Sequence, residues 1–121
     1  MQYPNMREEL IEYLSGLSDR EYQMNCWVNQ KCPEGIEKDT FDLAVHFLFD
    51  DTELAKSPEE TIGIFLKDKE EAQSIKSLCD EIDRIFEKYS TELTDKEYID
   101  CPEWNNVLNL AKTAYDALTK R

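Results

Sequence analysis

Apolar residues recur along this chain with the spacing of one helix face. The clearest stripe falls between residues 72 and 89, and its members are Ala72, Ile75, Leu78, Cys79, Ile82, Ile85, Phe86 and Tyr89. A stripe of this period predicts an amphipathic helix that buries one face in a core. Similar stripes over 104–118 and 6–17 predict a last helix and a first helix, the latter ending near Gly16.

Three further segments fit the helical period less cleanly. Residues 22–28 predict a second helix, while residues 41–49 are almost continuously apolar. That run is compatible with a buried helix started by Asp39 or with a central strand, and periodicity alone does not separate the two. Residues 62–66 carry the same ambiguity. We therefore predict an all-α fold, a single compact bundle of about five to six helices; the alternative is an α+β fold with short strands near 41–49 and 62–66.

Helix starts are marked by a cap residue followed three positions later by an acid. The cap oxygen accepts a hydrogen bond from an otherwise unpaired N–H group, which contributes about 1 kcal/mol. The pattern occurs five times, at Ser18–Glu21, Ser57–Glu60, Asp68–Glu71, Thr94–Glu97 and Asp100–Glu103. This repetition favours the helical fold.

The 121 residues are 40% hydrophobic and 11% aromatic, which suits one domain over 1–121 with one modest core. Trp27 and Trp104 fall at apolar-periodic positions and are expected in that core. Four cysteines contain no C-x-x-C pair and match no zinc-site spacing. We expect them to be reduced, with Cys26 and Cys79 as core thiols.

Charge restricts the partners of this protein. Fourteen Lys and Arg residues against 27 Asp and Glu residues give a net charge of −13. Such a charge repels phosphates and anionic lipid, so direct binding to nucleic acid or to a membrane is not expected, whereas a basic protein would be attracted. The sequence has no apolar run of about 18 residues and no secretory signal pattern at its start, so we expect a cytoplasmic location.

The negative charge is concentrated in the middle of the chain. Residues 34–60 hold nine acids and two lysines, a net charge of −7. We expect the partner to be bound by the acids of this region, namely Glu34, Glu37, Asp39, Asp42, Asp50, Asp51 and Glu53.

One constellation could carry metal or acid–base chemistry. Asp42, His46 and Asp50 are spaced i, i+4 and i+8, which places them on one face if the segment is helical. Two carboxylates and an imidazole suit a divalent metal, or a histidine oriented as a base. The structural alternative is that Asp39 or Asp42 caps the helix and His46 is partly buried. Nucleotide-binding glycine motifs, G-x-S-x-G and EF-hand spacing are absent from the sequence, so we expect no enzyme activity and no cofactor.

Several short runs resemble a family of small bacterial proteins without an assigned activity. The runs are Met6–Leu10, Tyr13–Leu14, Leu17–Asp19, Tyr22–Gln23, Asp39–Asp42, Val45–Thr52, Ile62–Gly63, Asp95–Tyr98 and Pro102–Trp104. The sequence V-H-F-L-F-D-D-T at 45–52, with P-E-W at 102–104, is the most specific part of a resemblance that covers most of the chain. It implies a bacterial, single-domain protein.

Together these features favour a small acidic interaction protein. The hypothesis is an immunity or inhibitor protein that neutralises a basic bacterial toxin, such as a nuclease toxin of an interbacterial competition system, by occluding its active site. Carboxylates would stand in for phosphates, and unlike charges would speed association. The alternatives are a metal-binding or hydrolytic protein that uses Asp42, His46 and Asp50, and a regulatory adaptor whose target is not a toxin.

Overall fold

The computed structural model describes residues 4–36, 39–51, 54, 56–64 and 66–120. Within these ranges the protein is all-α, as predicted, and has no strand beyond a single parallel bridge between Ile62 and Leu66. The α+β alternative is therefore wrong. The elements are α1 Pro4–Leu17, α2 Arg20–Tyr22, η1 Gln23–Val28, α3 Phe41–Val45, η2 His46–Asp51, η3 Pro58–Thr61, α4 Lys69–Tyr89, α5 Asp95–Asp100 and α6 Trp104–Thr119.

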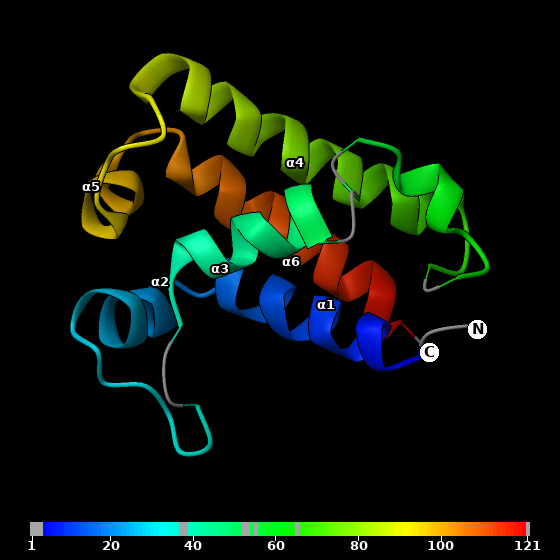
Figure 1. The fold of residues 1–121 in the computed structure, drawn as a ribbon, viewed down its shortest axis with the longest axis horizontal. Coiled ribbons are helices and arrows are strands. Elements are labelled where there is room, and N and C mark those ends of the chain that lie inside the picture. The colour runs from blue at the N-terminus through cyan, green and yellow to red at the C-terminus, as the bar shows by residue number, and fades with distance from the viewer. Residues whose placement is uncertain (1–3, 37–38, 52–53, 55, 65, 121) are drawn as a thin grey trace.

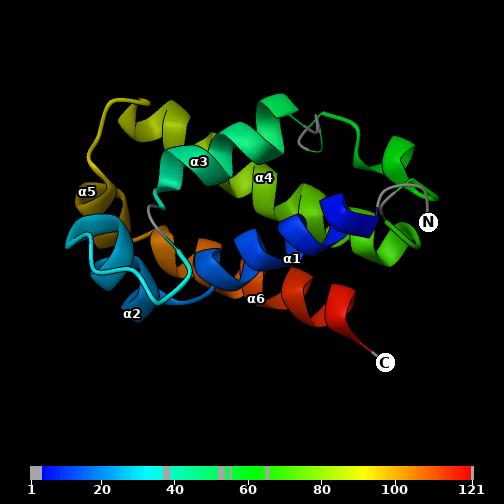
Figure 2. The same cartoon turned by 60° about the horizontal axis from the view of Figure 1, so that its bottom comes forward.

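Three long helices form the body of the bundle. α6 packs against α4 on one side and α1 on the other, and α3 with η2 crosses the face between α1 and α4 (Figures 1 and 2). Ring contacts fix this crossing, because Phe47 packs on Tyr13 of α1 and Phe49 packs on Phe86 of α4. None of the helices in the described ranges has the length and apolar character needed to cross a membrane.

An aromatic cluster joins segments from the first and last thirds of the chain at the core. Phe41 lies at ring-centroid distances of 5.9 Å from Trp27, 5.0 Å from Trp104 and 5.1 Å from Tyr98. Both tryptophans are buried, as the sequence predicted. The η1, α3, α5 and α6 segments are therefore held together around one phenylalanine.

The Trp104 indole also fixes η1 through a polar contact. Its Nε1 donates to Oε1 of the buried Gln23 at 2.8 Å, and Gln23 Nε2 donates to the carbonyl of Gly16 at 2.8 Å. The Gln23 amide thus pairs with both the indole N–H and the Gly16 carbonyl, which offsets the cost of burying these polar groups.

Two of the predicted helix starts are confirmed. Asp68 accepts from the Glu71 N–H at the start of α4. Thr94 and Glu97 form a reciprocal capping box at the start of α5. Ser57 precedes the short 3₁₀ helix η3 with Pro58 at its first position, but its side chain makes no cap hydrogen bond.

Other predicted starts are displaced. Asp19 replaces Ser18 as the cap of α2, and Thr40 replaces Asp39 as the cap of α3. The Asp100 prediction is wrong, because α5 buries Tyr98 and Ile99 and so extends to Asp100 before α6 begins at Trp104.

Candidate functional site

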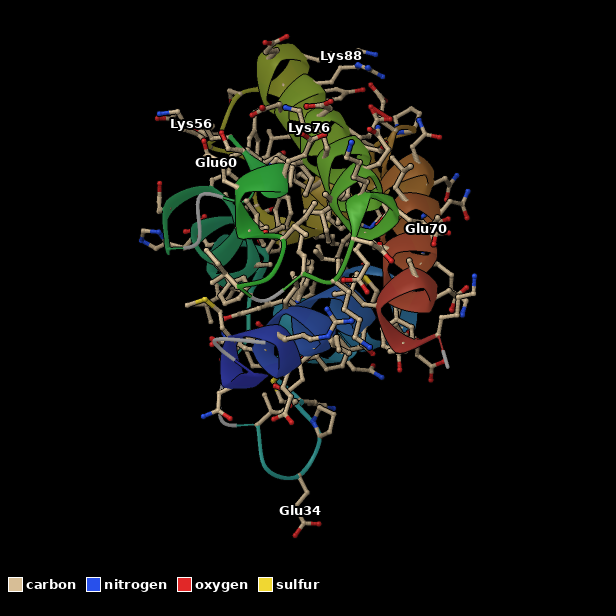
Figure 3. All side chains as sticks on the ribbon, turned by 90° about the vertical axis from the view of Figure 1, so that its right-hand side faces the viewer. Glu34, Lys56, Glu60, Glu70, Lys76 and Lys88 are labelled. Carbon is tan, nitrogen blue, oxygen red and sulfur yellow. A yellow bond between two sulfur atoms is a disulfide. The ribbon has the colours of Figure 1, made fainter. Side chains whose placement is uncertain are left out.

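The acids predicted to bind a partner are distributed over different elements. Glu34 projects from the loop between η1 and α3, away from the helical body (Figure 3). Asp42 and Asp50 are exposed on α3 and η2. In the described part of the chain, neither Glu34 nor Asp42 is paired with a lysine or arginine, so both charges face the solvent. Glu37, Glu53 and the side chain of Asp51 lie outside the described residues.

Asp39 has a structural role other than the helix cap that the sequence suggested. Its Oδ2 accepts from the Tyr22 hydroxyl at 2.6 Å and from Trp27 Nε1 at 3.2 Å, and its Oδ1 accepts from the Thr40 N–H at 2.9 Å. The carboxylate thus anchors the start of α3 to α2 and η1. Burial, and then the bond to the Asp39 carboxylate, raise the pKa of Tyr22, so its hydroxyl remains a donor at neutral pH.

The candidate metal or acid–base set is not assembled as the sequence suggested. His46 Nδ1 lies 2.6 Å from Asp50 Oδ2, but the side chains are 67% and 64% exposed. No group of three or more His, Cys, Asp and Glu side chains among the described residues is placed to hold a metal ion. The expectation of a partly buried His46 is also wrong, because α3 and η2 turn Phe47 and Leu48 inward and leave His46 on the outer face.

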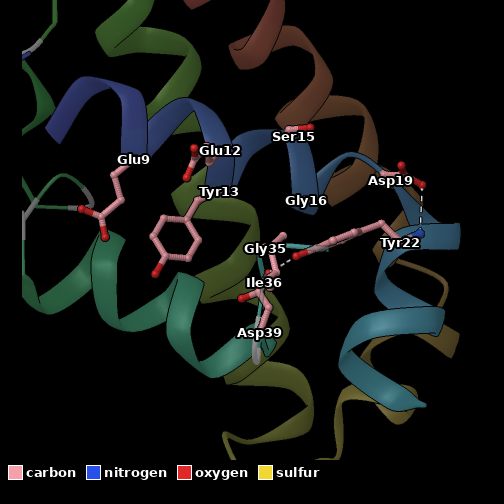
Figure 4. A pocket seen from close by; sticks show the side chains of 10 residues that line it. All are labelled: Glu9, Glu12, Tyr13, Ser15, Gly16, Asp19, Tyr22, Gly35, Ile36 and Asp39. Carbon is pink, nitrogen blue, oxygen red and sulfur yellow. Dashed lines mark hydrogen bonds between the residues drawn. The ribbon is translucent and has the colours of Figure 1, made fainter. Parts of the chain in front are cut away.

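The structure instead forms a cavity of about 480 Å³ beside α1 (Figure 4). One wall is α1, another is Tyr22, and the loop before α3 closes the side. We call this cavity the acidic groove, and its lining residues are Glu9, Glu12, Tyr13, Ser15, Gly16, Asp19, Tyr22, Gly35, Ile36 and Asp39.

Gly16 permits the close approach that shapes this wall. A Cβ built at Gly16 would lie 3.1 Å from Cε1 of Tyr22, tighter than an ordinary carbon contact. The missing side chain therefore lets the Tyr22 ring lie directly against the end of α1. From there its hydroxyl reaches Asp39.

The groove has four carboxylates and no basic side chain among its described lining residues. Glu9 and Glu12 are exposed, and Asp19 uses one oxygen to cap α2. Asp39 accepts the Tyr22 hydroxyl and so joins two sides of the groove. The rings of Tyr13 and Tyr22 add aromatic surface. Carboxylates beside aromatic faces suit a lysine or arginine side chain, through Coulomb attraction and cation–π contact.

Sequence reasoning missed Glu9, Glu12 and Asp19 because it followed charge density along residues 34–60. On a helix, Glu9 and Glu12 look like an ordinary solvated face. The available signal was that the acids of residues 4–19 are accompanied by Arg7 as the only basic residue.

A disulfide between Cys26 and Cys32 closes the loop next to the groove, with Cα atoms 4.2 Å apart. The prediction of four reduced cysteines is therefore wrong for this pair, while Cys79 and Cys101 are free thiols. The chain reverses sharply here, because the Lys31 N–H donates to the Asn25 carbonyl at 2.7 Å, and this reversal brings the two sulfur atoms together. Burial raises the pKa of the Cys79 thiol to about 12.

The fold and the groove define an acidic helical-bundle protein with a concave carboxylate-lined surface beside α1. The chain belongs to the family described as a domain of unknown function (DUF7945), whose model matches residues 1–121. No curated protein and no solved structure matches the chain.

Proposed function

We propose that this protein is an interaction protein that binds a basic protein partner through the acidic groove. The observation that carries the proposal is the convergence of Glu9, Glu12, Asp19 and Asp39 on one cavity whose described lining includes no lysine or arginine. The net charge of −13 supports it, since the surrounding field favours a cationic partner at long range.

The partner class that fits this chemistry is a bacterial toxin with a basic active site, such as a nuclease toxin. Residues that bind nucleic-acid phosphates are chiefly arginine and lysine. Glu9 and Glu12 would take the place of phosphates for one such side chain, with the rings of Tyr13 and Tyr22 beside it. In this proposal the protein is the immunity protein of an interbacterial competition system, and it acts by covering the toxin's active site.

The exposed acids outside the groove contribute in a different way. Glu34, Asp42 and Asp50 lie on the loop and on the outer face of α3 and η2, where they strengthen the field without forming a pocket. Charges of this kind raise the association rate and lose their effect as salt screens them.

The groove is tested with a labelled hexa-arginine peptide by fluorescence anisotropy. The Glu9→Gln/Glu12→Gln variant is expected to weaken binding about tenfold. The matched control is Glu87→Gln/Glu92→Gln, which removes the same charge from exposed positions outside the groove. Equal weakening by both variants would show that net charge, and not the groove, binds the peptide.

The immunity role is tested separately with the product of a toxin gene adjacent to the gene for this protein. The purified proteins should associate, and the association rate should fall as NaCl rises from about 50 to about 300 mM. Inhibition of the toxin's activity should be lost in the Glu9→Gln/Glu12→Gln variant. Unrelated metabolic genes on both sides, or a rate independent of salt, would contradict this role.

A further inference from the structure

The Cys26–Cys32 disulfide connects the core to one wall of the acidic groove. Cys26 is 1% exposed at the inner side of η1, whereas Cys32 is partly exposed at the start of the loop. Three and four residues further on, Gly35 and Ile36 line the groove. The disulfide is therefore a side-chain cross-link between the start of this wall and the buried part of η1.

The segment that carries the wall is anchored at its two ends. The disulfide holds Cys32 at one end, and the bonds to Tyr22 and Trp27 hold Asp39 at the other. In between, the Ile36 N–H donates to the Pro33 carbonyl at 3.1 Å, a bond internal to the loop, and residues 33–36 are exposed. After loss of the disulfide, one hydrogen bond, from the Lys31 N–H to the Asn25 carbonyl, would hold the start of this loop, and Asp39 would hold its end.

We propose that the Cys26–Cys32 disulfide is a redox-sensitive staple, and that its reduction by a small thiol releases the loop wall of the acidic groove. The release of the wall is inferred from the loop geometry alone. Its consequence, weaker binding of a basic partner, rests on the proposed function.

Reduction proceeds by thiol–disulfide exchange in a defined order of steps. The thiolate of a small thiol attacks Sγ of Cys32, the more accessible sulfur, and the S–S bond breaks as Cys26 leaves as a thiolate that then takes a proton. A second small thiol attacks the mixed disulfide and releases the Cys32 thiol. Two small thiols are oxidised to one disulfide, and the protein disulfide is reduced to two thiols.

Reduction is expected to act locally because other contacts hold η1 in place. Trp27 remains packed on Phe41, and Gln23 remains bonded to Trp104 and to Gly16. These contacts lie in the core and do not involve either sulfur atom. The loop is thus free to move while the bundle stays folded.

Hydrogen exchange tests the staple without any partner. Backbone amides of residues 29–36 are compared in protein oxidised with glutathione disulfide and in protein reduced with dithiothreitol. Reduction should speed their exchange about tenfold and leave α4 and α6 unchanged. Cys26→Ser/Cys32→Ser should behave as reduced under both conditions, and Cys79→Ser/Cys101→Ser should respond like the unaltered protein.

Three results would overturn the staple. They are equal exchange of residues 29–36 in both states, general unfolding on reduction by circular dichroism, and alkylation mass spectra that show free Cys26 and Cys32 after oxidation. Because the unaltered protein is measured in both states, a variant that fails to fold does not decide the outcome.

Hexa-arginine binding then separates the staple from the proposed function. We expect affinity about fivefold lower in the reduced protein. Unchanged affinity with a released loop would overturn the link between redox state and binding. No binding in either state would overturn the proposed function, while faster exchange on reduction would still support the staple.

Discussion

Arg7 and Glu71, 64 positions apart in sequence, form a buried two-armed ion pair. Nη1 donates to Oε1 and Nη2 donates to Oε2, both at 2.8 Å, and the side chains are 11% and 4% exposed. Arg7 Nη2 also donates to the carbonyl of Leu118 at 3.0 Å, and Glu71 Oε1 accepts from the Lys67 N–H at 2.7 Å. One guanidinium therefore ties α1 to α4 and to the end of α6.

We predict that Arg7→Met destabilises the fold by about 3 kcal/mol, because it leaves the Glu71 carboxylate buried without its cation. Urea denaturation measures the change. Lys96→Met is the matched control, since it breaks an ion pair with Asp100 in which both side chains are more than half exposed, and it should cost less than about 1 kcal/mol. Equal costs for the two variants would show that burial does not strengthen the Arg7 pair.

The second prediction concerns Asp39, which lines the acidic groove. Asp39→Ala removes the acceptor of the Tyr22 hydroxyl and the Trp27 indole N–H, and we expect a loss of about 2 kcal/mol in the free energy of unfolding. Asp39→Asn keeps one acceptor oxygen and should cost less. Thermal and urea unfolding compare the two, and equal losses would indicate that the charge, and not the hydrogen bonds, is what stabilises this anchor.

The long helices were predictable because their signal is local. The stripe from Ala72 to Tyr89 repeats within one segment, and the Thr94–Glu97 box is complete within four residues. Two of the three segments with unclear periods, 22–28 and 41–49, overlap the π-helical turns η1 and η2. Their i→i+5 hydrogen bonds shift the apolar positions away from the 3.6-residue period.

The acidic groove was not predictable because it depends on contacts between distant residues. Glu9 and Glu12 belong to α1, and only folding brings Gly35 and Asp39 to face them. The Cys26–Cys32 pair is close in sequence, but it was missed because an expected cytoplasmic location favours thiols over disulfides.

A third prediction follows from Asp95 at the start of α5. The carboxylate is partly buried, and its Oδ2 accepts from the Phe41 N–H at 3.3 Å. Burial raises its pKa above the ordinary 3.8, and the charges of Asp42 and Asp39 add to this, while the bond from Phe41 opposes it. The folded chain therefore holds this proton to higher pH than the unfolded chain does.

The difference in proton binding between the folded and unfolded chains determines the direction in which Asp95 changes stability with pH. Between pH 3.8 and the raised pKa the folded state binds more proton than the unfolded state, so the contribution of Asp95 to stability falls as the pH rises. Asp95→Asn keeps an acceptor for the Phe41 N–H and does not titrate. The free energy of unfolding of Asp95→Asn minus that of the unaltered protein should therefore rise from about pH 3.5 to about pH 6. Urea denaturation at each pH measures this difference. Asp42→Asn should shrink that rise by removing a nearby charge, and a difference independent of pH would contradict the burial of this carboxylate.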